Sequence, residues 1–334
     1  MKIDAYVHIL PPKFLNFLEK KAQSKYSTGM MKKYPTMVDL DSRFRFMDRY
    51  PDTLQVLTVT STQSMDQLTD SPAEALDLAK MVNDEMAELV EKYPDRFVAG
   101  IASLPMNDMD MTLKELERAI NDLRLRGVFV PIPINGKAVD RPEFMPFYEA
   151  MSKFNLPIFL HPAVGPGFTH YLDETEAKYG TWLLWGWPYE TAVTMTRLVF
   201  SGVMQRYPNL KILTHHAGSM VPYFNRRIEH WYDQCEMIYH DSPPLENYKK
   251  GLTRDPMEYF RMFYNDTNVV GSTPALMCAY DFFGAEHLLS GTDIPVEGLT
   301  RTTIESIERM DIPDSDKEKI FWGNAKKIMR LALV

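Results

Sequence analysis

Eight short apolar runs, nearly all separated by helical patterns, are the feature that most constrains the fold of this 334-residue chain. Apolar runs of this length that are bounded by turn signals predict buried strands. The predicted strands begin near residues 2, 53, 97, 127, 157, 210, 262 and 287. Because a regular alternation of strand and helix is typical of parallel sheets, the chain is predicted to be an α/β protein.

Helical patterns occupy the segments between these strands. The clearest helix begins at Ser71-Pro72-Ala73-Glu74, which resembles a capping box with proline at the first helical position, and ends before Pro94. Further helices are predicted over Leu113–Leu123, Pro142–Phe154, Tyr189–Gln205 and Thr273–Phe283. Eight strand–helix units in a chain somewhat longer than ~250 residues match the size of a (β/α)8 TIM barrel.

A doubly wound open sheet is the alternative fold. It would need a glycine-rich phosphate-binding turn after the first strand, and the residues there are Ile9-Leu10-Pro11-Pro12. The sequence contains no repeat at a fixed period, no low-complexity tract and no linker. We therefore expect residues 1–334 to form a single TIM-barrel domain, with residues 13–40 as a small insertion after the first strand, near the barrel mouth.

Histidine and aspartate residues gather at the predicted carboxyl ends of the strands. The first strand ends in His8, the fifth in His161 and the sixth in His215 and His216, and the eighth leads into Asp293. In a TIM barrel the chemistry lies at this end of the strands. Imidazole and carboxylate groups that converge in one pocket suit zinc, manganese or iron, with an open position for water or substrate. We therefore expect a divalent metal site at the barrel mouth.

Other candidate residues have two interpretations each. His215 is either a site residue or a buried neutral imidazole that donates to a backbone carbonyl. The tryptophans Trp182, Trp185 and Trp187 follow the fifth strand and are either core packing or a flat wall for a planar substrate. The aromatic segment that begins at Pro222 suits either an interface between subunits or packing within one subunit.

The composition excludes several classes of partner. The net charge is −8, and acidic and basic residues are interleaved without a basic stripe, which argues against nucleic acid. No apolar run approaches the ~18 residues of a membrane span, and the apolar stretch near the start is too short for a signal peptide. Two cysteines cannot build a disulfide framework, and this usage predicts a cytoplasmic protein.

Several short motifs follow one another along nearly the whole chain. They are IDAYVHILP, RFRFMD, RFVAGIASLPM, IFLHP, PYETA, THHAGSMVPYFNRRI, LLSGTDIPVEG and GNAKKIM. In this order and approximate spacing they resemble the decarboxylase branch of the amidohydrolase superfamily, which includes α-amino-β-carboxymuconate-semialdehyde, γ-resorcylate and 5-carboxyvanillate decarboxylases. Each motif alone is weak, and the ordered recurrence carries the resemblance.

The resemblance implies roles for individual residues. His8 and His161 match metal-ligand histidines of the family, and Asp293 matches the carboxylate that contacts the metal and moves the proton. His216 matches a histidine that acts as an acid, base or binding group on the substrate side. Arg227 matches a family arginine, for which we expect a structural, interface or substrate-binding role.

Tyr6 is the main departure from the family pattern, since it replaces the first histidine of the amino-terminal metal motif. A neutral phenol with an ordinary pKa near ~10 is a poorer ligand than imidazole. We therefore expect three protein ligands plus water on the metal, and assign Tyr6, together with His215, Trp187 and Arg227, to substrate binding. No arginine convincingly matches the one that binds the substrate carboxylate in the muconate enzyme.

The resemblance implies a non-oxidative decarboxylase, a carboxy-lyase, that acts on a small aromatic or dienoic carboxylic acid. Zinc is the expected cofactor, with manganese as the alternative. Two other functions stay open: a metal-dependent hydrolase or hydratase on the same barrel, and a ligand-binding barrel whose metal site is weakened by Tyr6. Relatives form dimers, so a homodimer is expected, without nucleic-acid or membrane partners.

Overall fold

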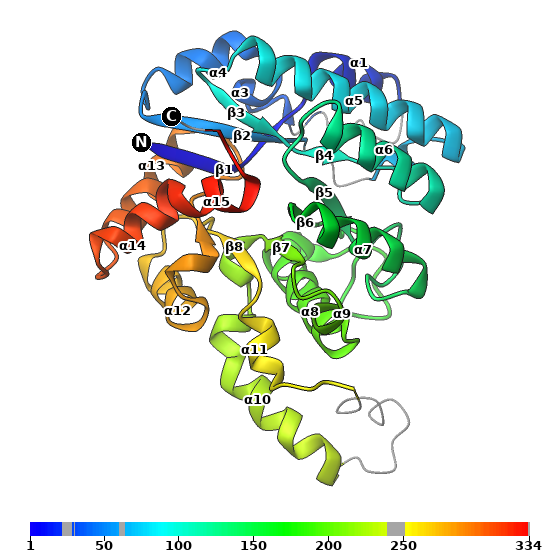
Figure 1. The fold of residues 1–334 in the computed structure, drawn as a ribbon, viewed down its shortest axis with the longest axis vertical. Helices are drawn as coiled ribbons and strands as arrows, with labels where there is room; N and C mark the ends of the chain where they lie inside the picture. Colours follow the sequence, from blue (N-terminus) through cyan, green and yellow to red (C-terminus); the bar gives the residue numbers. More distant parts are fainter. Residues whose placement is uncertain (22–28, 30, 60–63, 239–250, 333–334) are drawn as a thin grey trace.

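Parallel strands form the centre of the molecule in this computed structural model, which describes residues 1–21, 29, 31–59, 64–238 and 251–332 (Figure 1). The strands are β1 (Lys2–Ile9), β2 (Thr53–Val59), β3 (Phe97–Gly100), β4 (Ala102–Ser103), β5 (Val128–Ile132), β6 (Pro157–Pro162), β7 (Lys211–Thr214), β8 (Tyr264–Asp266) and β9 (Leu288–Leu289). They occur at all eight predicted positions, and β3 and β4 are two parts of the predicted third strand.

Hydrogen bonds between backbones arrange these strands in a ring. Strands β1 to β3 pair in one sheet and β4 to β9 in another, all in parallel register. Ile101 lies between β3 and β4. Its backbone N–H donates to the carbonyl of Leu57 in β2 at 3.0 Å, and this bond connects the two sheets. At the other seam, the N–H of Ala5 donates to Ser290 at 2.7 Å, so the last strand adjoins the first. This order confirms the predicted TIM-barrel fold.

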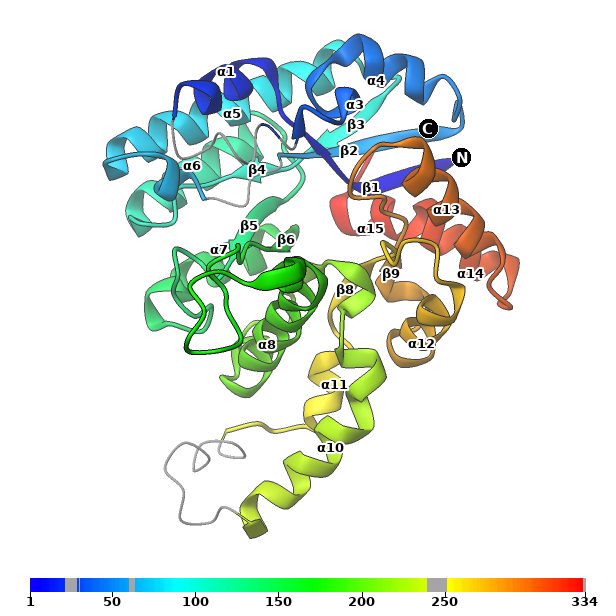
Figure 2. The ribbon, with the colours of Figure 1, turned by 180° about the vertical axis from the view of Figure 1, so that it is seen from behind.

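Helices surround the strands, as Figures 1 and 2 show from opposite sides. The α-helices are α1 (Pro12–Lys20), α3 (Pro35–Val38), α4 (Leu40–Met47), α5 (Pro72–Lys92), α6 (Met109–Asn121), α7 (Met145–Phe154), α8 (Trp187–Phe200), α9 (Val203–Arg206), α10 (Val221–Ile238), α11 (Pro256–Phe260), α12 (Thr273–Phe283), α13 (Glu297–Glu308), α14 (Asp314–Glu318) and α15 (Asn324–Met329). Short 3₁₀ or π turns are η2 (Met65–Leu68), η3 (Pro142–Phe144), η4 (Lys178–Gly180), η5 (Trp182–Gly186), η6 (His216–Gly218), η8 (Ala285–His287) and η9 (Lys319–Gly323). Among the described residues, no helix has the length and apolar character needed to span a membrane.

The start of α5 shows how local sequence sets a helix boundary. The Ser71 side chain accepts from the N–H of Glu74 at 3.3 Å, as the predicted capping box requires. The reciprocal bond differs from the prediction, because the Glu74 carboxylate accepts from the N–H of Asp70 at 2.9 Å. The reciprocal box is instead formed at η2, between Ser64 and Gln67.

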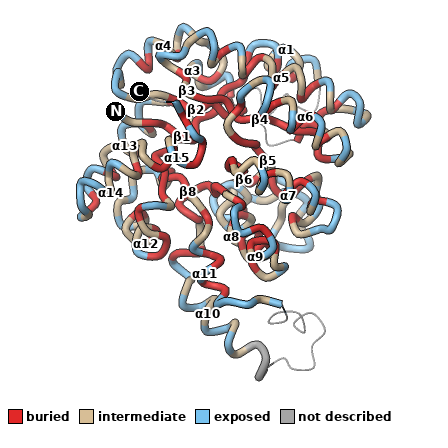
Figure 3. Tube along the Cα trace, viewed as in Figure 1, coloured by how far each residue is buried: buried red, intermediate tan, exposed pale blue. Residues whose placement is uncertain are grey.

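The core has two layers of side chains, and Figure 3 shows that the strands between them are largely buried. Alternate strand residues face opposite sides, so in β5 Val128 and Val130 pack against the helices while Phe129 faces the barrel interior. Phe129, Phe159 and Leu213 belong to the inner cluster, and each is at most 4% exposed. This packed interior gives the carboxyl ends of the strands a rigid floor.

The predicted insertion, residues 13–40, is described in part, because residues 22–28 and 30 lie outside the described ranges. The N–H of Leu10 donates to the carbonyl of Met37 at 2.8 Å, and the N–H of Lys13 donates to the Glu85 carboxylate at 2.8 Å. These bonds attach α1 and α3 to the end of β1 and to α5. The single-domain assignment stays a prediction.

Candidate active site

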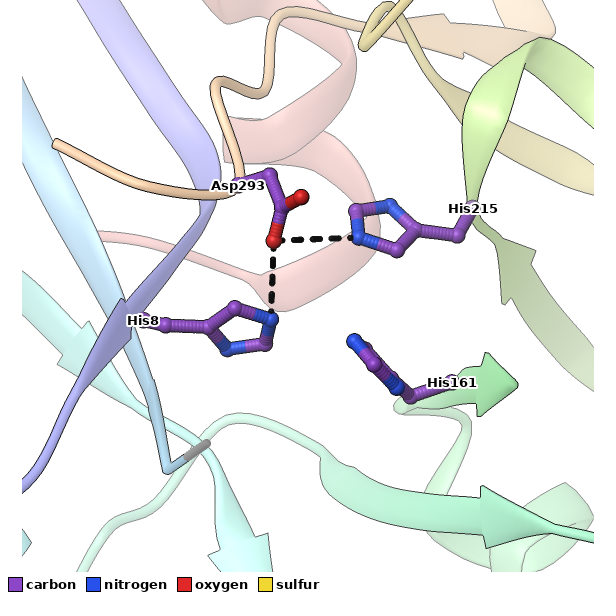
Figure 4. Close-up of side chains that lie close together, drawn as sticks. All are labelled: His8, His161, His215 and Asp293. Carbon is purple, nitrogen blue, oxygen red and sulfur yellow. Dashed lines mark ion pairs between the residues drawn. The ribbon is translucent and has the colours of Figure 1, made fainter. Parts of the chain in front are cut away.

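Four side chains from distant parts of the sequence meet at the carboxyl end of the barrel. They are His8 in β1, His161 in β6, His215 after β7 and Asp293 after β9. One possible ligand atom from each lies within 4.8 Å of all the others, and Figure 4 shows the side chains pointing toward a common centre. The three imidazoles are at most 4% exposed. We call this group the cluster.

Each imidazole of the cluster uses Nδ1 for a partner outside it. The partners are Thr58 Oγ1 for His8 at 2.8 Å, the Pro162 carbonyl for His161 at 2.8 Å, and the Asp266 carboxylate for His215. A carbonyl or carboxylate can only accept, and the Thr58 hydroxyl donates to the Val7 carbonyl, so Nδ1 carries the hydrogen in all three rings. In the neutral form of each ring, Nε2 would therefore have a free lone pair, as in histidines that bind metals.

The Nε2 atoms of His8 and His215 lie 3.0 and 3.4 Å from Asp293 Oδ1. Despite this closeness, neither nitrogen has a hydrogen-bond partner among the described residues. Buried polar atoms without a partner are rare in folded proteins and call for an ion or ligand. Three imidazole nitrogens and one carboxylate oxygen that converge in this way fit a divalent cation.

Charge interactions within the cluster are strong. Burial alone would lower the pKa of His215, but the Asp266 and Asp293 carboxylates raise it to about 10. Burial would raise the pKa of Asp293, yet the charge of His215 holds it well below its usual range. The pKa of His161 is lowered well below its usual range by burial and by the neighbouring imidazoles. Since a ligand histidine must be neutral, cation binding would release the proton of His215.

A buried polar network holds the two chain segments that carry His8 and Asp293. Asp4 accepts from the N–H of Thr292 at 2.9 Å and from its hydroxyl at 2.5 Å. Asp293 has a left-handed backbone with φ of 68°, and its carbonyl accepts from the N–H of His8 at 2.8 Å. The fully buried Arg43 donates to the carbonyl of His8 at 2.9 Å. Sequence reasoning missed these supporting roles of Asp4 and Arg43.

His216 lies beside the cluster and is not part of it. Its ring centroid is 4.3 Å from that of His215, and its backbone N–H donates to the Asp266 carboxylate at 3.0 Å. Burial and the charge of His215 lower the pKa of His216 to about 4, so the ring is neutral near pH 7. Its Nδ1 has no hydrogen-bond partner among the described residues, which leaves it free for substrate.

Tyr6 lies in the core and is fully buried. Its ring stacks on His215 with centroids 4.2 Å apart, and its hydroxyl donates to the carbonyl of Leu160 at 3.3 Å. Burial, together with the charges of Asp266 and Asp293, raises the pKa of Tyr6 well above 10, so the phenol is neutral. His215, which we had assigned to substrate binding, therefore supplies the fourth potential ligand that Tyr6 cannot. The expected contact between Tyr6 and substrate stays a prediction.

The other two predicted residues lie in different surroundings. Trp187 donates from its indole N–H to the carbonyl of Val164 at 2.8 Å, and its ring is edge-on to His161 at 5.5 Å, so it forms a wall beside the cluster. Arg227 is exposed on α10, 5.9 Å from the Trp231 ring, and lines a groove between α8 and α10. No cluster residue lines that groove, so within one subunit Arg227 is separated from the cluster.

Comparison with known proteins identifies the family of this chain. Residues 3–331 match the Amidohydrolase family. The chain belongs to the amidohydrolase family. This confirms the resemblance drawn from the motifs, and the cluster lies at the end of the barrel where the active sites of this fold are found.

Relatives of this amidohydrolase are decarboxylases. It is 30% identical to 2-amino-3-carboxymuconate-6-semialdehyde decarboxylase of Dictyostelium discoideum, covering 99% of this chain and 92% of that protein. It is 32% identical to γ-resorcylate decarboxylase of a Polaromonas species, covering 87% of each. It is 26% identical to 6-methylsalicylic acid decarboxylase of Penicillium expansum, covering 98% of this chain and 95% of that protein.

A solved structure is similar over the whole chain. It is dihydroxybenzoic acid decarboxylase from Polaromonas sp. JS666 with bound manganese and the inhibitor 2-nitroresorcinol. The TM-score is 0.78 and the sequence identity 27%, over 100% of this chain and 98% of that one.

Proposed function

We propose that this amidohydrolase is a metal-dependent, non-oxidative decarboxylase of a hydroxylated aromatic acid. The observation that carries the proposal is the cluster, in which three Nε2 atoms and one carboxylate oxygen converge at the barrel mouth of a chain related to decarboxylases. A dienoic acid such as a muconate is the alternative substrate, since 2-amino-3-carboxymuconate-6-semialdehyde decarboxylase is also a relative.

The residues that would hold the cation are His8, His161, His215 and Asp293. A mixed set of imidazole and carboxylate donors suits both zinc, which the sequence led us to expect, and manganese, which the Polaromonas structure contains. A cation bound there would act as a Lewis acid toward the substrate carboxylate and the adjacent phenolic oxygen. Asp266 would keep the His215 ring in the ligand orientation through its bond to Nδ1.

Asp293 is the residue placed to move the proton. Its side chain is 16% exposed, whereas those of His8 and His215 are 2% and 0%, so it is the member of this trio that reaches the mouth. Asn268 donates to its Oδ2 at 3.1 Å and orients the carboxylate. Because its pKa is low, Asp293 is ionised near pH 7 and can accept a proton.

The reaction replaces a carboxylate on the ring by hydrogen. Asp293 would accept the proton of the substrate phenol and deliver it to the ring carbon that carries the carboxylate. The carbon–carbon bond then breaks, its electron pair stays on the ring, and carbon dioxide leaves. The phenol recovers a proton from solvent, so no redox cofactor is needed. The neutral ring of His216 would hydrogen-bond the substrate from the side.

The proposal is tested by metal content and carbon dioxide release. We expect purified protein to contain one zinc or manganese ion per chain and to release carbon dioxide from 2,6-dihydroxybenzoate or 6-methylsalicylate. His161→Ala should lose both, whereas the control His170→Ala, on an exposed loop, should keep both. Turnover of an ester or amide, with no release from any hydroxybenzoate, would favour the hydrolase alternative.

We further propose that two copies of the chain associate through the groove between α8 and α10. Tyr189 and Phe224 line this groove and are 51% and 40% exposed. Exposed apolar grooves with aromatic residues and an arginine are typical of interfaces. A homodimer in analytical ultracentrifugation that becomes a monomer on Phe224→Asp would support the proposal. A monomeric parent protein would contradict it.

A further inference from the structure

A small apolar pocket lies at the carboxyl ends of β2, β4 and β5, which supply no cluster residue. Its lining includes Phe129, and the Phe129 ring is 6.1 Å from the His8 ring and 5.5 Å from the His161 ring, measured between centroids. One aromatic ring thus touches both the cluster and the pocket. The cluster and the pocket are therefore neighbours on either side of the Phe129 ring.

Ser103 is the polar group that distinguishes this pocket. It pairs with Phe129 in the parallel register of β4 and β5 and, like Phe129, faces the barrel interior, whereas its neighbour Ala102 packs toward the helices. Its backbone is fixed by Asn83, which accepts from the Ser103 N–H at 2.8 Å and donates to the Ser103 carbonyl at 2.9 Å. The position of the Ser103 side chain is therefore set by the fold.

The hydroxyl of Ser103 has no hydrogen-bond partner among the described residues, although Ser103 is only 3% exposed. The second hydroxyl of the pocket, on Ser64, donates to Asn135 at 2.5 Å and accepts from the N–H of Gln67. Buried hydroxyls are nearly always paired, so an unpaired one that faces a pocket calls for a ligand.

The remaining lining decides which chemical group fits. It is apolar and includes Met65 and Met106, whose unbranched side chains can rotate to widen the space. The pocket has room for about one water molecule, which is the size of a ring substituent and not of a ring. Among the described residues, no lysine or arginine lines it, so a second carboxylate would be buried without a counter-ion.

We propose that this pocket binds a hydroxyl substituent of the aromatic substrate, and that Ser103 is the residue that selects it. The inference rests on the proposed function and deepens it. With the carboxylate and one phenolic oxygen at the cluster, the flank of the ring beyond the carboxylate turns toward the pocket. A hydroxyl at the second position next to the carboxylate pairs with Ser103, whereas a methyl group there leaves the serine unpaired.

Two acids that differ only at this position provide the test. The parent protein should decarboxylate 2,6-dihydroxybenzoate with kcat/KM at least about tenfold above that for 6-methylsalicylate, because sites built for a hydroxyl discriminate against analogues that lack it. Ser103→Ala should lower kcat/KM for 2,6-dihydroxybenzoate, so that the ratio of the two values falls to near one. The metal content should be unchanged. Ser201→Ala, at the exposed serine that directly follows α8, is the control and should keep the parent ratio.

A binding measurement separates this inference from the proposed function. Calorimetry of the metal-loaded protein with 2-nitroresorcinol and with 3-methyl-2-nitrophenol needs no turnover. Tighter binding of 2-nitroresorcinol that is lost in Ser103→Ala supports the pocket, even if neither acid is decarboxylated and the proposed function fails. Decarboxylation with equal preference for both acids, or discrimination that survives in Ser103→Ala, overturns the inference and leaves the proposed function standing.

Discussion

Replacement of Asp4 by asparagine should change how the stability of the protein depends on pH. Asp4 is 2% exposed and accepts two hydrogen bonds from Thr292, next to Asp293. Burial raises its pKa from 3.8 to about 7, against the opposing effect of the Thr292 hydrogen bonds and the charge of Arg43. Asparagine has the same shape, can accept from the Thr292 N–H, and has no proton to lose.

The sign and size of the effect follow from the difference in pKa. Between about pH 4 and pH 7 the folded protein keeps the proton of Asp4, whereas the unfolded chain has released it. The unfolding free energy therefore falls as pH rises through this window, and the loss is complete above the folded pKa. Each unit of pH in the window changes it by about 1.4 kcal/mol, so the total is about 4 kcal/mol.

Urea unfolding at several pH values from about 5 to about 8 measures this effect. The unfolding free energy of Asp4→Asn minus that of the parent should increase by about 1.4 kcal/mol per pH unit up to about pH 7 and then level off. Asp173→Asn, on an exposed loop, is the control and should show a difference near zero throughout. A difference for Asp4→Asn that is constant over the whole range would refute the reasoning.

Three further predictions follow from the cluster and the core. Tyr6→Phe should keep its metal, measured by mass spectrometry, and lose about 1 kcal/mol of stability with the bond to Leu160; loss of metal would instead make Tyr6 a ligand. Asp266→Asn should weaken metal binding about 10- to 100-fold in competition with a chelator, because His215 loses its charged partner; an unchanged affinity would exclude His215 as a ligand held by Asp266. Phe159→Ala should cost about 3–5 kcal/mol in urea unfolding, since Phe159 is fully buried inside the barrel; a loss below about 1 kcal/mol would mean that the interior refills the cavity.

The strands and several helices could be predicted because their signals are local. The predicted helix over Thr273–Phe283 has the bounds of α12, where Ser272 caps the start and Gly284, with φ of 79°, follows the end. The predicted helix Tyr189–Gln205 is interrupted in the structure, since α8 ends at Phe200 and Gly202 adopts φ of 80° before α9. Gly202 therefore marks the interruption in the sequence. The π turn before α8 has no such local marker, because it depends on how Trp182 and Trp187 pack.

The cluster could be predicted only in part. His8, His161 and Asp293 stand at strand ends, so the barrel rule brings them together. His215 was not predicted as a ligand: the resemblance assigned His216 to the substrate side, and His215 was assigned to substrate binding. In the structure Leu213 faces the barrel interior and residue 215 continues the same face, which brings His215 into the cluster.

The arrangement of donors around the barrel also determines where a substrate can approach. The donors lie on β6, after β7, after β9 and on β1, which form one continuous arc of the ring. The opposite arc, from β2 to β5, supplies none and instead holds the pocket with Phe129 and Ser103. His215 follows β7, which lies on the same arc as β1, so its replacement of Tyr6 as a candidate ligand leaves the opposite arc without candidate ligands among the described residues. A substrate held at the cluster would then have the β2-to-β5 side of the barrel mouth open to its ring, which is where the proposed selection by Ser103 would act.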